Sequence, residues 1–447
     1  MHLPSSVEPT FLKLSPAFTQ RTAFRMAVLM VGMILSRGRH TITAALRTIG
    51  ALAPGHFSSY HRLFSRAAWS PWVLSHELTR VVLELFPRGQ TIPVAVDETT
   101  AEHKGAKVYG KGCHRDAVRS THTHTAYKWG HKWVVLSIAV KFPWARCPWS
   151  LPIMAVLYRP EKLDRAEHRR HKTPSELARQ MFAALIHWFP ERNFVLLGDG
   201  GYATVELAHF CSRHRRHLVS RLRADAALYA PPPPRTKKEH GRPRVKGRRI
   251  ASPGEMAKRE NAAWKNATVD WYGGGIRRVR LLTGTGLWYN HGRSILIRWV
   301  YVVDREGTHR DDCIFSTDIM LSPERIVSLF TRRWSIEVTF QEARAHLGFE
   351  TTRQHVARSV LRMAPCLLGL FTVVTLAFAS HLRRHPVHPA RTSWYDKHDL
   401  TFSDAIAAVR RQLWCETVFG ISTHDSLVPK LPRSFRTRLL DALSQAA

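Results

Sequence analysis

Three acidic residues have the surroundings that metal-dependent chemistry requires. Asp97 ends the apolar run TIPVAVD and Asp199 follows NFVLLG, so each carboxylate is predicted at the exposed end of a buried strand. Glu337 lies in the helical pattern FTRRWSIEVTFQEARAHLGFE, where Arg333 and Gln341 share its helix face. Carboxylate oxygens suit Mg²⁺ or Mn²⁺, and two such ions can activate water and stabilise a leaving oxygen in phosphodiester cleavage. The three acids therefore predict a metal-dependent site for cutting nucleic acid.

Each acid also has an ordinary structural explanation. An Asp at a strand end often caps the next turn, and Glu337 has an i,i+4 partner in Arg333. The catalytic interpretation is favoured because all three acids are expected to converge in a strongly basic protein. Glu98 is ranked lower as a ligand, since it should point to the opposite strand face from Asp97. Glu342 is ranked lower because it turns away from Glu337 along the helix.

The composition indicates a polyanionic partner. The chain has 67 Lys and Arg against 34 Asp and Glu, a net charge of +33 before any of the 26 His is counted. Such a charge repels itself in the compact state, and nucleic acid is the usual partner that neutralises it. A basic proteome that enriches Arg everywhere is the alternative explanation. With 447 residues, 44% of them hydrophobic, the chain can bury a sizeable core in roughly two to four domains.

The order of the predicted elements is that of a ribonuclease-H-like mixed sheet, an α/β fold. Strands are expected at Thr91–Asp97, Lys132–Phe142, Leu151–Tyr158, Phe194–Gly198 and His217–Leu222. Helices are expected at 174–189 and Ala203–Arg213, the first with a capping box of Thr173 and Glu176 and with Pro174 at its first position. In such a sheet the first and fourth strands are neighbours, which brings Asp97 and Asp199 together.

The remaining regions predict a helical N-terminus and C-terminus around an interrupted catalytic domain. Residues 1–88 have helical patterns at Phe18–Leu35, Thr41–Ile49 and Ser58–Ala67, which fit helix-turn-helix DNA recognition or an ordinary basic bundle. The catalytic domain is expected in two parts, 89–224 and 316–380, and a helical C-terminal region at 381–447.

A β-rich insertion is expected at 225–315, because 138 positions separate Asp199 from Glu337. It begins with a basic tract too poor in apolar residues to fold alone, and alternating strands follow at Arg277–Leu282 and Ser294–Val303. The tract is either a solvated linker or, as its charge favours, a contact for DNA phosphates. The residues predicted to make those contacts are Lys237, Lys238, Arg248 and Arg249.

Cysteine usage and hydropathy favour a cytoplasmic protein. The six cysteines form no CxxC pair, which is typical of reduced thiols, and the spacing of Cys113-His114 from His122 and His124 matches no common zinc site. No signal peptide is expected, since the first apolar stretch comes late. The apolar segment 363–379 is short for a membrane span and contains Pro365, so a buried core helix is the favoured interpretation.

The chain resembles the DDE transposases of bacterial insertion sequences, in the branch with a β-strand insertion before the final Glu. The motifs that carry the resemblance are AVDETT, LLGDGGYA and RRWSIEVTFQEARAHLGFE, with weaker support from GHKWVVLSIAV and HKTPSELARQ, over about residues 25–380. The family's last block has Tyr, Arg, Glu and Lys where this chain has Phe330, Arg333, Glu337 and Arg344. The substitutions remove one hydroxyl and change the geometry of one cation.

The resemblance implies a DNA transposase that binds the terminal inverted repeats of its element. Asp97, Asp199 and Glu337 would hold Mg²⁺, with Mn²⁺ as a substitute, and hydrolysis would free a 3′-hydroxyl that attacks target DNA. Arg333 and Arg344 would contact backbone phosphates. A homodimer would form when two ends are synapsed, in the bacterial cytoplasm at the nucleoid. Some relatives stack a flipped base on a Trp of the insertion, for which the candidates are Trp264, Trp271, Trp288 and Trp299.

Two other classes of protein remain open. One is a decayed or domesticated transposase that binds DNA without cutting it, which the departures at Phe330 and Arg344 allow. The other is a host nuclease or resolvase on the same fold, which would not explain both a DNA-end-binding region and a large insertion.

Overall fold

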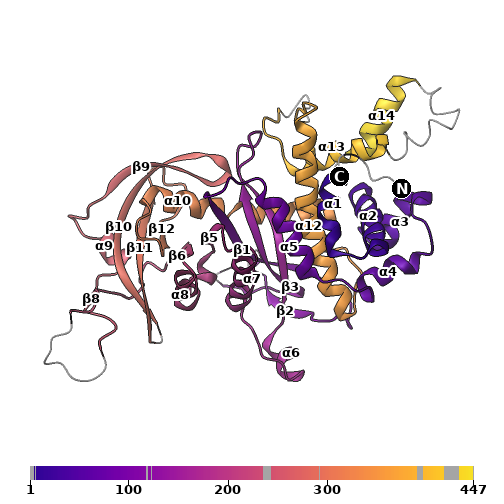
Figure 1. Ribbon diagram of the computed structural model, residues 1–447. Coiled ribbons are helices and arrows are strands. Elements are labelled where there is room, and N and C mark those ends of the chain that lie inside the picture. The colour runs from indigo at the N-terminus through magenta and orange to yellow at the C-terminus, as the bar shows by residue number, and fades with distance from the viewer. Residues whose placement is uncertain are drawn as a thin grey trace.

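The computed structural model describes residues 5, 7–116, 119–121, 123–234, 243–290, 292–389, 396–416 and 432–445. Within these residues a sheet of 12 strands forms the centre of the molecule (Figure 1). The strands are β1 (Thr91–Glu102), β2 (Gly112–Arg115), β3 (Tyr127–Val140), β4 (Trp149–Tyr158), β5 (Asn193–Leu197), β6 (His217–Arg221), β7 (Leu228–Tyr229), β8 (Arg249–Ile250), β9 (Lys265–Asp270), β10 (Ile276–Asn290), β11 (Arg293–Asp304) and β12 (Asp312–Ser316).

Helices flank this sheet along the whole chain. They are α1 (Glu8–Leu14), α2 (Gln20–Leu35), α3 (Ile42–Ile49), α4 (Phe57–Ser65), α5 (Pro71–Leu83), α6 (Glu161–Ala166), α7 (Pro174–Trp188), α8 (Val205–Arg213), α9 (Pro253–Ala257), α10 (Pro323–Arg332), α11 (Ser335–Leu347), α12 (Ala357–Leu382), α13 (Phe402–Trp414) and α14 (Arg433–Ser444). The predicted capping box at the start of α7 is confirmed, since Thr173 accepts from the Glu176 amide and Glu176 accepts from the Thr173 amide.

One half of the sheet has the predicted arrangement. Its order is β4-β3-β1-β5-β6, with β1 parallel to β5, β5 parallel to β6, and the other pairs antiparallel. All five predicted strands are present, and the first and fourth of them, β1 and β5, are neighbours. The chain is therefore a mixed α/β protein whose sheet is consistent with a ribonuclease-H-like nuclease fold. The short edge strand β2 was not predicted.

The strands of the predicted insertion continue the same sheet. β12 pairs antiparallel with β6, placing Ile314 opposite Arg221, and β11, β10 and β9 follow outward. In Figure 1 these long strands curve away from the helical half of the molecule. The β-rich segment thus continues the sheet beyond β6, while the domain boundaries on either side of it stay a prediction.

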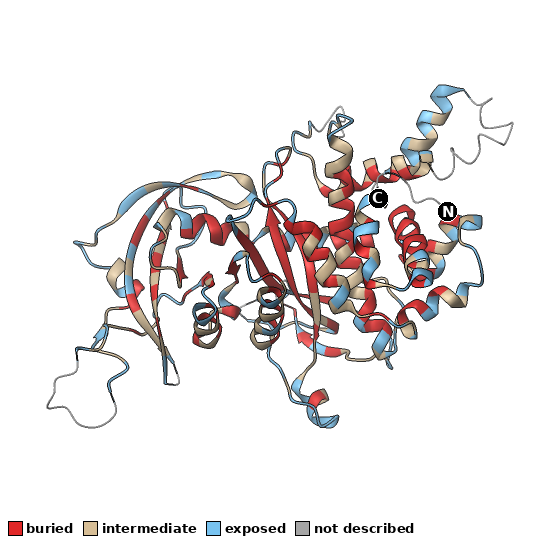
Figure 2. Cartoon of the chain, viewed as in Figure 1, coloured by how far each residue is buried: buried red, intermediate tan, exposed pale blue. Residues whose placement is uncertain are grey.

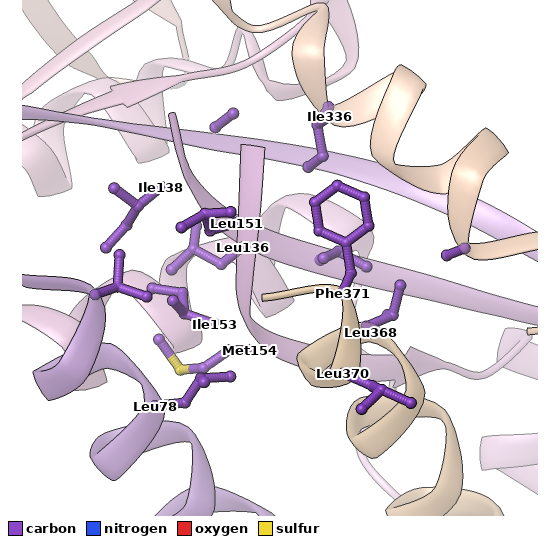
Figure 3. Close-up of a cluster of buried hydrophobic side chains, with 14 of the residues drawn as sticks. Leu78, Leu136, Ile138, Leu151, Ile153, Met154, Ile336, Leu368, Leu370 and Phe371 are labelled. Carbon is purple, nitrogen blue, oxygen red and sulfur yellow. The ribbon is translucent and has the colours of Figure 1, made fainter. Parts of the chain in front are cut away.

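The core lies between the sheet and the helices that cover it, as the buried residues in Figure 2 show. Figure 3 shows Leu78 of α5, Ile336 of α11 and Phe371 of α12 gathered over β3 and β4. Residues of α2, α3 and α4 belong to the same hydrophobic cluster, so the N-terminal helices share their core with the sheet. The predicted helix-turn-helix role of these helices stays a prediction.

The apolar segment around 363–379 is confirmed as a core helix. Among the described residues, α12 is the one helix long and apolar enough to cross a membrane, yet 67% of its most apolar stretch is buried. It packs along β4, where Thr372 donates to the backbone oxygen of Pro152 at 2.8 Å. Its apolar character is explained by burial in protein.

Candidate active site

The strand register places Asp97 and Asp199 at the same edge of the sheet. The last pair between β1 and β5 is Ala95 with Leu197, and each acid follows its paired residue by two positions. β1 does not end at Asp97, however, because its pairing with β3 continues to Glu102. The prediction of an exposed strand end was wrong for Asp97, which is 9% exposed inside a longer strand. Only the pairing of β1 with its parallel neighbour β5 stops nearby, at Ala95.

Local sequence fixes the carboxylate of Asp199. Its Oδ1 atom accepts from the Gly201 amide at 2.9 Å, and its backbone oxygen accepts from the Ser220 hydroxyl at 2.6 Å. A Cβ atom at Gly198 would lie 2.7 Å from Cβ of Tyr202, so this position requires glycine. The motif GDGGY is therefore a tight turn that holds Asp199 next to the strand end.

Glu337 lies just after a junction between two helices. The sequence predicts one continuous helical face through Arg333 and Glu337, but α10 ends at Arg332 and α11 begins at Ser335. The tighter i→i−3 bonds of Arg333 to Phe330, at 3.1 Å, and of Glu337 to Trp334, at 3.0 Å, form this junction. Its consequence is that Arg333 turns inward and is 8% exposed.

The Arg333 guanidinium bridges two of the three acids. One nitrogen donates to Oδ2 of Asp97 at 2.6 Å and the other to Oε1 of Glu337 at 2.9 Å. The guanidinium carbon also lies 5.9 Å from the ring centre of Phe330. Through these two hydrogen bonds Arg333 connects Glu337 of α11 to Asp97 of β1, two elements that are far apart in the sequence.

Asp97 has a strongly perturbed acidity. The pKa of Asp97 is raised to about 7. Burial raises it most, and the charges of Asp199 and Glu337 act in the same direction, whereas Arg333 and the Glu98 amide lower it. The three carboxylates are thus close enough to act on one another electrostatically. Perturbed carboxyl groups of this kind are typical of functional sites.

Tyr202 is a residue of this site that the sequence reasoning missed. Its side chain is buried, its hydroxyl has no hydrogen-bond partner among the described residues, and burial together with the charges of Glu98, Asp97 and Asp199 raises its pKa. A buried hydroxyl without a hydrogen-bond partner costs free energy of folding. Its place in GDGGYA, three positions after Asp199, was the available signal.

The donor chemistry of the site fits a divalent cation. Carboxylate oxygens of Asp97, Asp199 and Glu337 are hard ligands, and a cation would offset both the burial of the Asp97 charge and the repulsion from the other two acids, which together raise the pKa of Asp97. In the described residues, however, no three His, Cys, Asp or Glu side chains are grouped closely enough to hold a metal ion. Arg333 already donates hydrogen bonds to carboxylate oxygens of Asp97 and Glu337. An ion there would compete with Arg333.

The side chains of the two acids ranked lower have partners other than the three candidate acids. Glu98 is exposed and pairs with Lys132 at 3.1 Å, while Glu342 pairs with His346 at 3.2 Å. Their partners are unconnected with Asp97.

The predicted DNA-binding cations other than Arg333 have different surroundings. Arg344 is held in the fold, donating to Oε1 of Glu350 at 3.0 Å and to the Thr99 hydroxyl. Arg248 and Arg249 are exposed at the short strand β8. Lys237 and Lys238 lie outside the described residues.

The four Trp residues named as candidates for stacking a flipped base have different surroundings. Trp299 is fully buried, and Trp288 packs on Phe315 with ring centres 5.1 Å apart. Trp264 packs on Tyr301 and beneath Arg280. Trp271 lines a groove that also contains Trp334, beside the helix junction.

The Cys113-His114 pair is placed on opposite faces of β2, with Cys113 exposed and His114 buried. His122 lies outside the described residues, so the zinc alternative gains no support from β2.

A family model described as DDE superfamily endonuclease matches residues 13–278. The match includes Asp97 and Asp199 and ends before Glu337, which is linked to Asp97 through Arg333. No curated protein matches the chain. The family is one of metal-dependent nucleases that act on DNA, which agrees with the predicted class of enzyme and substrate. With more than half of its length matched, and with a sheet of the corresponding kind, the chain belongs to the DDE superfamily endonucleases.

Proposed function

We propose that this protein is a DNA transposase, which binds the terminal inverted repeats of its element, cleaves at them and joins the freed 3′-hydroxyl ends to target DNA. The observation that carries the proposal is the convergence of three acids from separate elements. Asp97 of β1 and Asp199 after β5 stand at one sheet edge, and Arg333 links Asp97 to Glu337 of α11.

Each acid has a role in this proposal. Asp97, Asp199 and Glu337 hold Mg²⁺ or Mn²⁺, and such ions, when bound, supply a nucleophile at neutral pH and offset charge on the scissile phosphate. Asp97 contributes a buried carboxylate, fixed by the Glu98 amide at 2.8 Å. Asp199 is fixed by its turn. Glu337 lies on a helix anchored to β4 by Thr339, which donates to the Ser150 backbone oxygen at 2.8 Å.

Arg333 has two states in this proposal. It neutralises Asp97 and Glu337 before cations bind, and it then turns to a backbone phosphate of the DNA. Its guanidinium fork suits either partner, because carboxylate and phosphate offer the same paired oxygens. Arg344 is proposed as a second phosphate contact close to β1.

The remaining parts of the proposal concern DNA binding and assembly. The helices of residues 1–88 recognise the transposon ends, and the basic tract with Lys237, Lys238, Arg248 and Arg249 contacts phosphates. Two copies pair when both ends are synapsed. The element is proposed to be a bacterial insertion sequence, with the enzyme acting at the nucleoid.

The deciding experiment is cleavage of a labelled duplex that carries the element's terminal repeat, with and without Mg²⁺. Wild type is compared with Asp97→Asn and with Glu98→Gln, a matched control on the exposed face of the same strand. Wild type and Glu98→Gln are expected to cut at the repeat boundary, and only when the metal is present. Asp97→Asn is expected not to cut. End binding is expected in all three. Metal-independent cutting, or normal cutting by Asp97→Asn, would refute the assigned site.

A second candidate function is DNA binding without cleavage. It is favoured by one observation, the engagement of Asp97 and Glu337 by Arg333 in place of a grouped set of metal ligands. Binding to the repeat with no cutting in either Mg²⁺ or Mn²⁺ would favour this candidate over the transposase.

A further inference from the structure

Strand β3 carries a row of aromatic side chains that extends from the buried core to the protein surface. Alternate residues share one face of a strand, so Tyr127, Trp129, His131 and Trp133 lie in line. The row is buried at one end, where Trp133 is 1% and His131 is 2% exposed, and open at the other, where Trp129 is 58% and Tyr127 is 66% exposed. Two large adjacent aromatics at a strand end with so little cover are available to a partner.

The surroundings of these two rings are basic. Lys111 places its ammonium 5.4 Å from the centre of the Trp129 ring, and Arg115 of β2 is exposed directly opposite Tyr127. Lys104 and Lys128 line the same hollow as the rings, in which the one acid is Glu102. Exposed rings interleaved with cations are the composition of surfaces that bind single-stranded nucleic acid.

This hollow leads toward the candidate active site. Lys104 also lines a neighbouring hollow that contains Glu350 and Arg353. Glu350 accepts from Arg344, whose guanidinium also reaches Thr99, two positions from Asp97. Along β3, Trp129 is six residues from Val135, which pairs with Asp97, a span of roughly 20 Å at the rise of a β-strand.

We propose that Tyr127 and Trp129, with Lys104, Lys111 and Arg115, form a binding site for an unpaired DNA strand next to the position of cleavage. Bases expose their faces for stacking only when they are unpaired, whereas fully paired DNA would use the cations alone. The inference rests on one part of the proposed function, namely that the protein binds DNA. It adds a site outside both the N-terminal helices and the basic tract.

The test measures DNA binding by the full chain in EDTA, so that cleavage plays no part. The probes are a labelled duplex with an unpaired tail and a fully paired duplex of the same length. The variants are Tyr127→Ala/Trp129→Ala, the ring-retaining Trp129→Phe, and Phe435→Ala as a control. Phe435 is 53% exposed on α14, far from β3 (Figure 1).

The double alanine variant is expected to bind the tailed probe about tenfold more weakly, with affinity for the paired duplex changed by less than about twofold. Trp129→Phe and Phe435→Ala are expected to bind both probes like wild type. Trp129→Phe keeps the test valid if the double variant folds poorly, because wild-type tryptophan fluorescence should be quenched by the tailed probe and this quenching should fall in Trp129→Phe. Unchanged affinity of the double variant for the tailed probe would overturn the inference and leave the proposed function standing. Selective binding of the tailed probe by a protein that never cuts DNA would support the inference and remove the proposed catalysis.

Discussion

The guanidinium of Arg333 donates a 2.6 Å hydrogen bond to Oδ2 of Asp97, a residue 236 positions away in the sequence. Both side chains are nearly buried, with 10% and 13% of their surfaces exposed. A buried charge pair costs desolvation, which its mutual attraction and further hydrogen bonds must offset. Here the second bond, to Glu337, gives the cation two carboxylate partners. One arginine therefore sets the charge balance of the candidate site.

Replacing this arginine should leave Asp97 buried without a counter-charge. Arg333→Ala is expected to lower the free energy of unfolding by about 3 kcal/mol at pH 8. Urea unfolding monitored by circular dichroism measures the change. Asp97→Asn made in the Arg333→Ala background should recover part of the loss, because the uncompensated charge is then absent. If the costs of the two single substitutions simply add, the residues are not coupled.

Glu337 should be required for chemistry and not for DNA binding. Glu337→Gln keeps the side-chain shape but removes a charged oxygen ligand, so cleavage in Mg²⁺ is expected to fall by at least about a hundredfold with end binding within about twofold. Glu342→Gln is the matched control on the same helix, since Glu342 pairs with His346 and should cut like wild type. Equal loss in both variants would indicate damage to α11 in place of a role for Glu337.

The exposed cations at β8 should contribute to DNA affinity through counterion release. Arg248→Ala/Arg249→Ala is expected to reduce the slope of log affinity against log salt by about two, because two phosphate contacts are lost. Fluorescence anisotropy across a salt series measures the slope. Arg383→Ala/Arg384→Ala, an exposed pair after α12, removes the same charge and should change the slope less. Identical slopes in the two double variants would mean that only net charge matters.

The contribution of His131 to stability should be lost in mild acid. The pKa of His131 is lowered to about 4. Burial lowers it most, and the charges of His103 and Lys111 act in the same direction, whereas the hydrogen bond to the backbone oxygen of Tyr109 raises it. In the unfolded chain a histidine titrates near 6.5, so between roughly pH 6.5 and 4 the unfolded state binds the extra proton. Stability contributed by neutral His131 is therefore complete above that window and is lost as the pH falls through it, by up to about 1.4 kcal/mol per pH unit.

Urea unfolding from pH 7.5 to 4.5 tests this dependence. His131→Gln is expected to give a shallower decline than wild type, while His388→Gln, at an exposed position, should follow wild type. A decline of equal steepness in His131→Gln would assign the acid sensitivity to other groups.

The sequence by itself predicted most of the elements and named Asp97, Asp199 and Glu337 as the candidate acids. Apolar runs specify β1 and β5, and the Gly-rich turn after β5 specifies how Asp199 is held, because these are properties of neighbouring residues. Thr173 and Glu176 specify the start of α7 for the same reason. The order of the strands then brings Asp97 and Asp199 together, as the known topology of such sheets requires.

Only the tertiary structure decided which long-range contacts surround and connect the candidate acids. The length of β1 depends on its antiparallel partner β3, which carries the strand past Asp97 and buries that residue. The break between α10 and α11 turns Arg333 inward to Asp97, although the sequence pattern continues across the break as one helix. The joining of β12 to β6 likewise makes the predicted insertion part of the central sheet. These features rest on contacts between residues far apart in the chain, whose energies exceed local propensity and leave no periodic pattern in the sequence.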